Sequence, residues 1–188
     1  MKKIISLSLF VFFLAGCQAI DSALTTSGRI TESTSPFDNQ IAIAMSPALA
    51  NSGMKDIQAE FGLFWQTSFE NTVVFSVKIN EIENFSPTQP LLIRVDGVLY
   101  ELPPFDNFSS AEFDIEYLRG VGVVSSSTKA FRGNKEIVEA IINGTEASYR
   151  ISLSRRYADG EITYRYRNYN SYIPAAFSAF LARVKQEI

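Results

Sequence analysis

Apolar and polar residues alternate with a period of two in the first strongly patterned part of the chain. Every second residue is apolar from residue 57 to residue 65, and the same alternation returns from residue 73 to residue 79. This period places the apolar side chains on one face of a β-strand, so each segment predicts a strand with one buried face. The connection near residues 68–71 is short, which indicates an antiparallel hairpin.

Two apolar runs at residues 91–95 and 98–102 predict a second hairpin, because Asp96 and Gly97 separate them. A type I′ turn needs positive φ at both central residues, and Asp-Gly suits that requirement. The turn pairs three sets of residues on one face: Leu91 with Leu102, Ile93 with Tyr100, and Val95 with Val98.

A third hairpin is predicted over residues 149–166, with its turn at Asp159 and Gly160. Its register gives two apolar pairs: Leu153 with Tyr166, and Tyr157 with Ile162. Other segments have strand-like patterns as well: residues 111–117, residues 121–131, and residues 41–45, which predict an edge strand or a short helix that Pro47 ends.

Two helices are predicted late in the chain. Asn134 suits the N-cap and Gly144 the C′ position of a short helix with apolar residues four apart. A second helix, which Asn170 or Ser171 can cap, has one apolar stripe: Ile173, Phe177, Phe180, Leu181, Val184 and Ile188. These elements predict an α+β fold, mostly antiparallel β: a curved sheet or sandwich of about seven strands, a short helix and a C-terminal amphipathic helix.

The N-terminus has the pattern of a signal peptide. Lys2 and Lys3 precede a mainly apolar segment, residues 4–14, which is shorter than the ~20 residues of a transmembrane helix. The sequence Leu14-Ala15-Gly16-Cys17 follows and resembles the lipobox of bacterial lipoproteins. The resemblance implies cleavage before Cys17 and lipid on its thiol and on the new amine. The alternative is a free Cys17 buried in a leader helix.

The lipoprotein resemblance also implies a location. Gln18 stands where an Asp favours the inner membrane in related lipoproteins, so we expect an outer-membrane anchor, with the domain on the periplasmic face or the cell surface. The predicted division is a signal peptide at 1–16, a lipidated N-terminus and flexible tether at 17–36, and one β-rich domain at 37–188. An ordered first strand is the alternative to the tether.

The second half of the chain contains Arg94-Val95-Asp96-Gly97, then a predicted helix, Gly144, two predicted strands and Ile173-Pro174-Ala175-Ala176-Phe177. This order resembles the invasion-associated locus B family of periplasmic β-proteins. The cysteine pair usual in that family is missing here, and we carry no function over from it.

Composition narrows the classes of function. Without the two leader lysines, the chain has 15 basic and 20 acidic residues, a formal charge of −5, so no nucleic acid partner is expected. The chain has no His, and Cys17 is its only Cys, which removes common bases, nucleophiles and metal ligands. We expect no metal, no cofactor and a non-enzymatic protein that binds or scaffolds an envelope component. The alternative is an envelope hydrolase or modifying enzyme that uses Ser, Lys, Tyr or carboxylates.

Two motifs are interpreted as structural. Ser126 and Lys129 fit the S-x-x-K pattern of penicillin-binding enzymes, which requires a helix; in the strand predicted here they point to opposite faces. Glu112, Asp114 and Glu116 share one face of a predicted strand and could bind calcium, but a solvated face is the favoured interpretation.

The outer face of the third predicted hairpin is the candidate binding site. It carries Arg150, Arg165 and Arg167, whose guanidinium groups suit phosphate or carboxylate. The expected partner is an anionic envelope component or an envelope protein, besides the membrane that the N-terminal lipid enters. The alternatives are a solvated strand face or ion pairs with the acidic strand at residues 112–116.

Overall fold

The computed structural model describes residues 27–50, 57–81, 83–105, 110–114, 124–163, 165–166, 169–170 and 172–187, with side chains for all of these except 110–114, 124–125, 165–166 and 169–170. The predicted signal peptide, Cys17 and the first part of the predicted tether lie outside the described residues. Within the described part of the chain, no helix combines the length and apolar character needed to cross a membrane.

The first sheet has six antiparallel strands: β1 (Ile30–Thr34), β2 (Ile41–Leu49), β3 (Ala59–Gln66), β4 (Thr72–Ile79), β8 (Val124–Asn134) and β7 (Ser110–Asp114), in that spatial order. Its inner face buries the residues that the alternation predicted: Ala59, Phe61, Leu63, Trp65, Val73, Phe75, Val77 and Ile79. The short 3-10 helix η1 (Thr67–Phe69) joins β3 to its antiparallel neighbour β4, so the first predicted hairpin is confirmed.

The second sheet has four antiparallel strands: β10 (Tyr157–Glu161), β9 (Ala147–Ser152), β5 (Leu91–Val95) and β6 (Val98–Leu102). Between β5 and β6, Asp96 has φ 47° and Gly97 has φ 87°, and all three predicted pairs are present. The second predicted hairpin is therefore confirmed. A separate two-stranded ribbon consists of β11 (Arg165–Tyr166) and β12 (Tyr169–Asn170).

The turn predicted for the third hairpin was wrong. Asp159 and Gly160 lie inside β10, which pairs with β9 so that Asp159 faces Arg150. The chain reverses between Leu153 and Arg156, where the Leu153 N–H donates to the Arg156 carbonyl at 2.9 Å. A Cβ atom at Gly160 would come within 2.3 Å of the Tyr149 hydroxyl, so the glycine is needed for packing and not for a turn.

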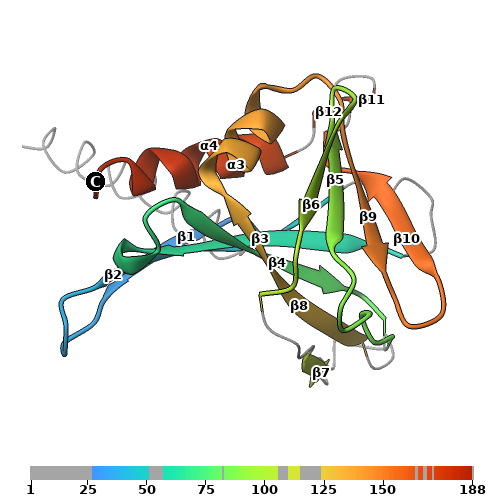
Figure 1. The fold of residues 1–188 in the computed structure, drawn as a ribbon, viewed down its shortest axis with the longest axis horizontal. Helices are drawn as coiled ribbons and strands as arrows, with labels where there is room; N and C mark the ends of the chain where they lie inside the picture. Colours follow the sequence, from blue (N-terminus) through green and yellow to red (C-terminus); the bar gives the residue numbers. More distant parts are fainter. Residues whose placement is uncertain are drawn as a thin grey trace, which may run out of the picture.

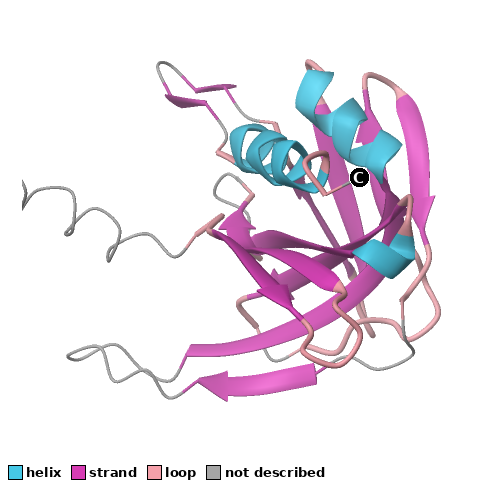
Figure 2. Ribbon diagram, turned by 90° about the vertical axis from the view of Figure 1, so that its left-hand side faces the viewer, coloured by secondary structure: helices cyan, strands magenta, loops and turns pink. Residues whose placement is uncertain are grey.

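Two different layers cover the inner face of the first sheet (Figure 1, Figure 2). Helices α3 (Lys135–Asn143) and α4 (Ile173–Val184) cover one end, where the Phe75 and Phe177 ring centroids are 6.0 Å apart. The second sheet covers the other end, where the Phe61 and Tyr149 centroids are 5.1 Å apart. Figure 1 shows its strands crossing those of the first sheet. The predicted α+β fold, mostly antiparallel β with a C-terminal helix, is confirmed.

The helix ends follow the predictions only in part. The Asn134 side chain accepts a hydrogen bond from the Ile137 N–H at 3.0 Å, which confirms the N-cap of α3. Gly144 has φ −72°, so it is not a left-handed C′ residue; a Cβ there would meet Val95 at 2.4 Å. The predicted cap of α4 was wrong, because Tyr172 is the N-cap residue and its side chain makes no capping hydrogen bond.

The N-terminal edge of the domain begins earlier than predicted. Strand β1 pairs with β2 along its length, and Arg183 of α4 forms an ion pair with Glu32. Residues 30–34 therefore belong to the folded domain and not to a tether that reaches residue 36. Strand β2 is not an edge, and Pro47 lies at a register shift inside it. Because β1 is mostly polar and exposed, apolar periodicity could not predict it.

Candidate functional site

The candidate site is the face of the second sheet that points away from the core. Alternate residues of its four strands are exposed or half-buried there, while the residues between them are buried on β5, β9 and β10. We call it the open face, and its residues are Leu92, Arg94, Leu99, Glu101, Ser148, Arg150, Ser152, Tyr157, Asp159 and Glu161. It includes the one arginine of the predicted site whose side chain the structure describes, Arg150.

Two adjoining hollows run over the open face. The first, of about 280 Å³, extends from Leu99 to Asp159, and the second, of about 450 Å³, extends to the turn at Asp96 and to Thr145. Arg94, Ser148 and Glu161 line both hollows. Small-molecule pockets have volumes of ~300–1,000 Å³ and are enclosed. These shallow, adjoining hollows are better suited to an elongated partner.

Arg150 is not free to bind an anion. Its Nε and Nη2 donate to the two carboxylate oxygens of Asp159 at 2.8 and 2.9 Å, and its guanidinium lies 5.4 Å from the Tyr157 ring centroid. The hydrogen bonds and the charge of Asp159 raise the pKa of Arg150. The predicted cationic patch is thus neutralised at Arg150, and by a different carboxylate from those considered in the sequence analysis.

Arg165 and Arg167 lie outside the residues whose side chains the structure describes. The predicted pairing of Leu153 with Tyr166 and Tyr157 with Ile162, which defined the outer face of the predicted hairpin, does not form, since β9 pairs with residues 157–161. The acidic side chains at residues 112–116 also lie outside the described side chains. The predicted site is therefore placed only at Arg150.

Arg94 is also a cation of the open face, and the sequence analysis did not predict it as a binding residue. It is exposed, lies opposite Ser148 on β9 and Leu99 on β6, and has no ion pair among the described residues. The available signal was its position in the second predicted hairpin, where it alternates with the buried Ile93 and Val95.

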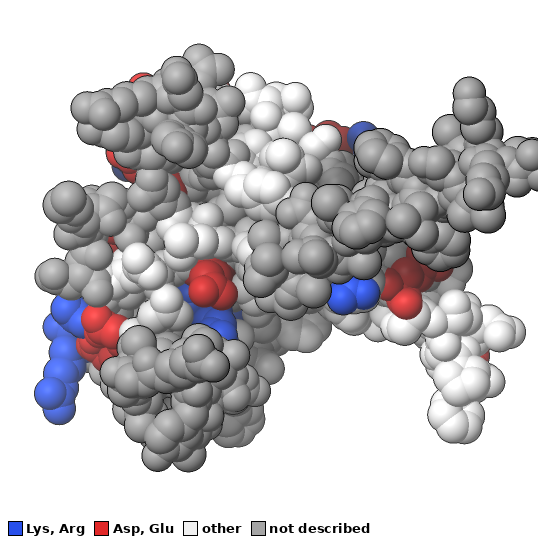
Figure 3. Space-filling model, turned by 180° about the vertical axis from the view of Figure 1, so that it is seen from behind, with Lys and Arg blue, Asp and Glu red and all other residues white. Residues whose placement is uncertain are grey.

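The charges around the two hollows are mixed and, in sum, acidic. Their linings contain two arginines and four carboxylates, a formal charge of −2: Arg94, Arg150, Asp96, Glu146, Asp159 and Glu161. Asp96 is partly satisfied by the N–H groups of Thr145 and Glu146, at 2.9–3.2 Å. Seen from behind in Figure 3, acidic groups likewise lie beside the basic ones. This balance does not favour an anionic ligand.

Tyr149 lies below the open face, on the inner side of β9. Its hydroxyl is buried and has no hydrogen-bond partner in the part of the chain that the structure describes. Burial, with a smaller contribution from the charge of Asp159, raises the pKa of Tyr149 to about 12. The phenol is therefore protonated at neutral pH and is a poor nucleophile or base.

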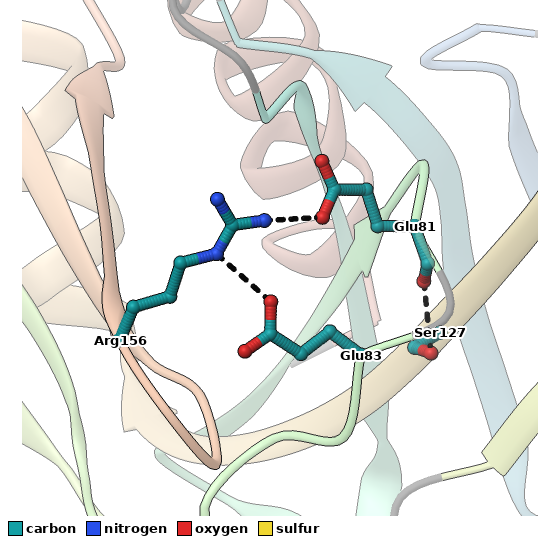
Figure 4. A network of polar contacts seen from close by, with 4 residues as sticks. All are labelled: Glu81, Glu83, Ser127 and Arg156. Carbon is teal, nitrogen blue, oxygen red and sulfur yellow. Dashed lines mark hydrogen bonds and ion pairs between the residues drawn. The ribbon is translucent and has the colours of Figure 1, made fainter.

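Arg156 belongs to a different structure, the joint between the two sheets (Figure 4). Its Nε donates to Glu83 at 2.9 Å and its Nη2 to Glu81 at 2.5 Å, so the fork ties the β9–β10 turn to the β4–β5 connection. Ser127 of β8 donates to the Glu81 carbonyl at 3.1 Å. We call Glu81, Glu83, Ser86, Pro87, Ser127, Lys129 and Arg156 the sheet joint.

Lys129 completes the sheet joint and is only 2% exposed. Its Nζ donates to the Ser86 and Pro87 carbonyls at 2.6 and 2.9 Å. Ser126 is 3% exposed and, by strand alternation, lies on the opposite face of β8 from Lys129. The S-x-x-K match therefore does not form a nucleophile–base pair. Among the described residues, no acidic cluster suited to a metal ion is present.

Comparison with protein-family models, with curated proteins and with solved structures finds no match to this chain. The geometry and electrostatics of the open face are therefore the basis of the functional proposal.

Proposed function

We propose that this chain is a non-enzymatic outer-membrane lipoprotein whose domain binds another envelope protein through the open face of its second sheet. The lipobox resemblance at Cys17 supports the anchor. The observation that carries the binding role is the pair of adjoining hollows around Arg94, which has no ion pair among the described residues. Because Arg150 is neutralised and the linings carry a formal charge of −2, a protein segment fits this face better than an anionic lipid or glycan.

The membrane anchor is tested at Cys17. The Cys17→Ser variant should leave an uncut precursor or release the domain into the soluble fraction. Mass spectrometry of the membrane-derived protein should find lipid on Cys17, and an unmodified thiol there would contradict the anchor.

The binding role is tested by photo-crosslinking in intact cells. A photoreactive residue at Leu92, inside the first hollow, should give a protease-sensitive adduct with another protein. The same residue at Ser178, which is exposed on α4, serves as the matched control and should give none. Adducts with lipid or glycan alone, or equal protein adducts from both positions, would reject the proposal.

A further inference from the structure

We infer that β6 is a docking strand, to which an extended, basic segment of the partner protein adds as a fifth strand of the second sheet. This inference rests on the proposed function and names how the partner binds and which chemistry it presents. It concerns the edge of the sheet at residues 98–102, next to the two hollows.

The backbone of β6 has hydrogen-bonding groups available at this edge. Val95 and Val98 flank the two-residue turn and form the first hydrogen-bonded pair of the hairpin. Since such pairs alternate with non-bonded ones, Leu99 and Glu101 direct their N–H and C=O groups away from β5. In the described part of the chain, no backbone hydrogen bond outside the strand ladders uses Leu99 or Glu101.

Apart from Glu101, β6 lacks the features that normally prevent strand addition. Natural edge strands carry Lys, Pro or a bulge that discourages pairing. Residues 98–102 read Val-Leu-Tyr-Glu-Leu, their pairing with β5 has no register shift, and Val98 and Leu99 are 55% and 46% exposed. The opposite edge, β10, carries Asp159 and Glu161. A mainly apolar edge strand whose pairing has no bulge is explained by a partner that covers it.

The charges beside β6 select a basic segment. On an added strand, the residues opposite Leu99 and Glu101 would lie on the open-face side, and those opposite Val98 and Tyr100 on the other side. Glu101 is exposed on the first side, and the two adjoining hollows carry a formal charge of −2 with Arg94 and Arg150 included. Lys or Arg is therefore favoured there, in alternation with apolar residues.

The length of the docked segment follows from the ends of β6. The Asp96-Gly97 turn begins the strand and Pro103-Pro104 follows it, and Pro cannot donate to a ladder. The contact is therefore confined to about five residues, as in strand addition to other sheet edges, where backbone hydrogen bonds give affinity and alternate side chains give specificity.

The experiment uses the mature full chain in detergent and a probe peptide of about ten alternating Lys and Val residues. Binding should slow amide hydrogen exchange at Leu99 and Glu101 by about tenfold or more, with smaller changes at Val98 and Tyr100, which already pair with β5. A peptide N-methylated at its Lys residues, which lie opposite Leu99 and Glu101, should not bind. A Glu-Val peptide should bind at least about tenfold more weakly, a difference of ~1.4 kcal/mol.

A matched pair of variants locates the contact. Leu99→Lys should weaken binding of the Lys-Val peptide by about tenfold or more, because it places a charge on the edge. Leu49→Lys is the control: Leu49 is 47% exposed, close to the 46% of Leu99, but lies in the first sheet, on β2 opposite Glu60 of β3. No binding, equal binding of the Glu-Val peptide, binding without protection of Leu99 and Glu101, or equal loss in both variants would each overturn the inference. A protein adduct at Leu92 in cells would then leave the proposed function standing.

Discussion

The sheet joint and the open face both combine cations with oxygen acceptors, but they differ in where the partners come from. In the joint, Arg156 reaches Glu83 and Glu81, which lie 73 and 75 residues away in the sequence, and Lys129 reaches carbonyls 42 and 43 residues away. On the open face, Arg150 pairs with Asp159 inside one hairpin, and Arg94 has no ion pair among the described residues.

This difference separates polar groups that hold the fold together from polar groups that remain available. Long-range contacts in the joint connect the two sheets, so removal of one member should lower the free energy of unfolding. Contacts on the open face are local or absent, so changes there should affect binding more than stability. Four predictions test the contrast, from the largest expected effect to the smallest.

Lys129→Ala should have the largest effect on stability. The change leaves a cavity and removes the donor from two carbonyls, at 2.6 and 2.9 Å. Each buried acceptor left unsatisfied costs ~1–3 kcal/mol. Urea unfolding should measure the loss. The control is Lys78→Ala on β4, where the half-buried lysine lies opposite Thr128. If both variants lost the same free energy of unfolding, the buried contacts of Lys129 in the sheet joint would contribute no more to stability than a half-buried lysine.

Tyr149→Phe tests the buried hydroxyl between the core and the open face. The folded-state pKa of about 12 lies above the ordinary value of 10.0, so the unfolded chain loses its proton first as pH rises. The free energy of unfolding should therefore fall between pH 10 and pH 12, by roughly 2 kcal/mol from this group. The variant should lose that part of the slope and gain stability near pH 7, because an unsatisfied hydroxyl is removed. If Tyr149→Phe left the pH dependence of the free energy of unfolding unchanged between pH 10 and pH 12, the raised pKa of Tyr149 would be contradicted.

Arg156→Gln should have a smaller effect, because the Arg156 side chain is partly exposed. Ion pairs of this kind contribute ~1 kcal/mol or less, with more where several charges form a network. The neighbouring exposed Arg155 has no ion pair among the described residues, so Arg155→Gln is the matched control and should shift the urea midpoint less. If Arg156→Gln and Arg155→Gln had equal urea midpoints, the ion pairs of Arg156 would contribute nothing measurable to the stability of the sheet joint.

The contrast also explains which parts of the structure could be predicted. The β5–β6 hairpin was predictable because the turn residues and the apolar alternation specify the same register. The prediction of a turn at Asp159-Gly160 was wrong because Gly160 is needed for another reason: a side chain there would collide with Tyr149. The sequence does not show that Tyr149 packs against this position. Strand β1 was not predicted because a polar edge strand has no apolar periodicity.

The candidate site was less predictable than the fold. Its arginines could be counted in the sequence, but their availability depends on which carboxylates the folded chain brings to them. Asp159 faces Arg150 only in the observed register, and Glu81 and Glu83 reach Arg156 only through the joint. Arg94 was passed over because its hairpin carried no charge pattern, although the register of that hairpin was predicted correctly.

The last prediction concerns Arg94, where the effect on stability should be smallest. Arg94→Gln should change the free energy of unfolding by no more than about 0.5 kcal/mol, since an exposed, unpaired side chain contributes little. In cells, it should alter the yield of the protein adduct from Leu92, because Arg94 borders both hollows that the partner covers. Arg150→Gln provides the comparison. It breaks the bidentate pair and leaves Asp159 without that cation, so its stability loss should exceed that of Arg94→Gln. If Arg94→Gln destabilised the domain as much as Lys129→Ala, Arg94 would belong with the groups that hold the sheets together, and the open face would lose its unpaired cation as an argument for binding.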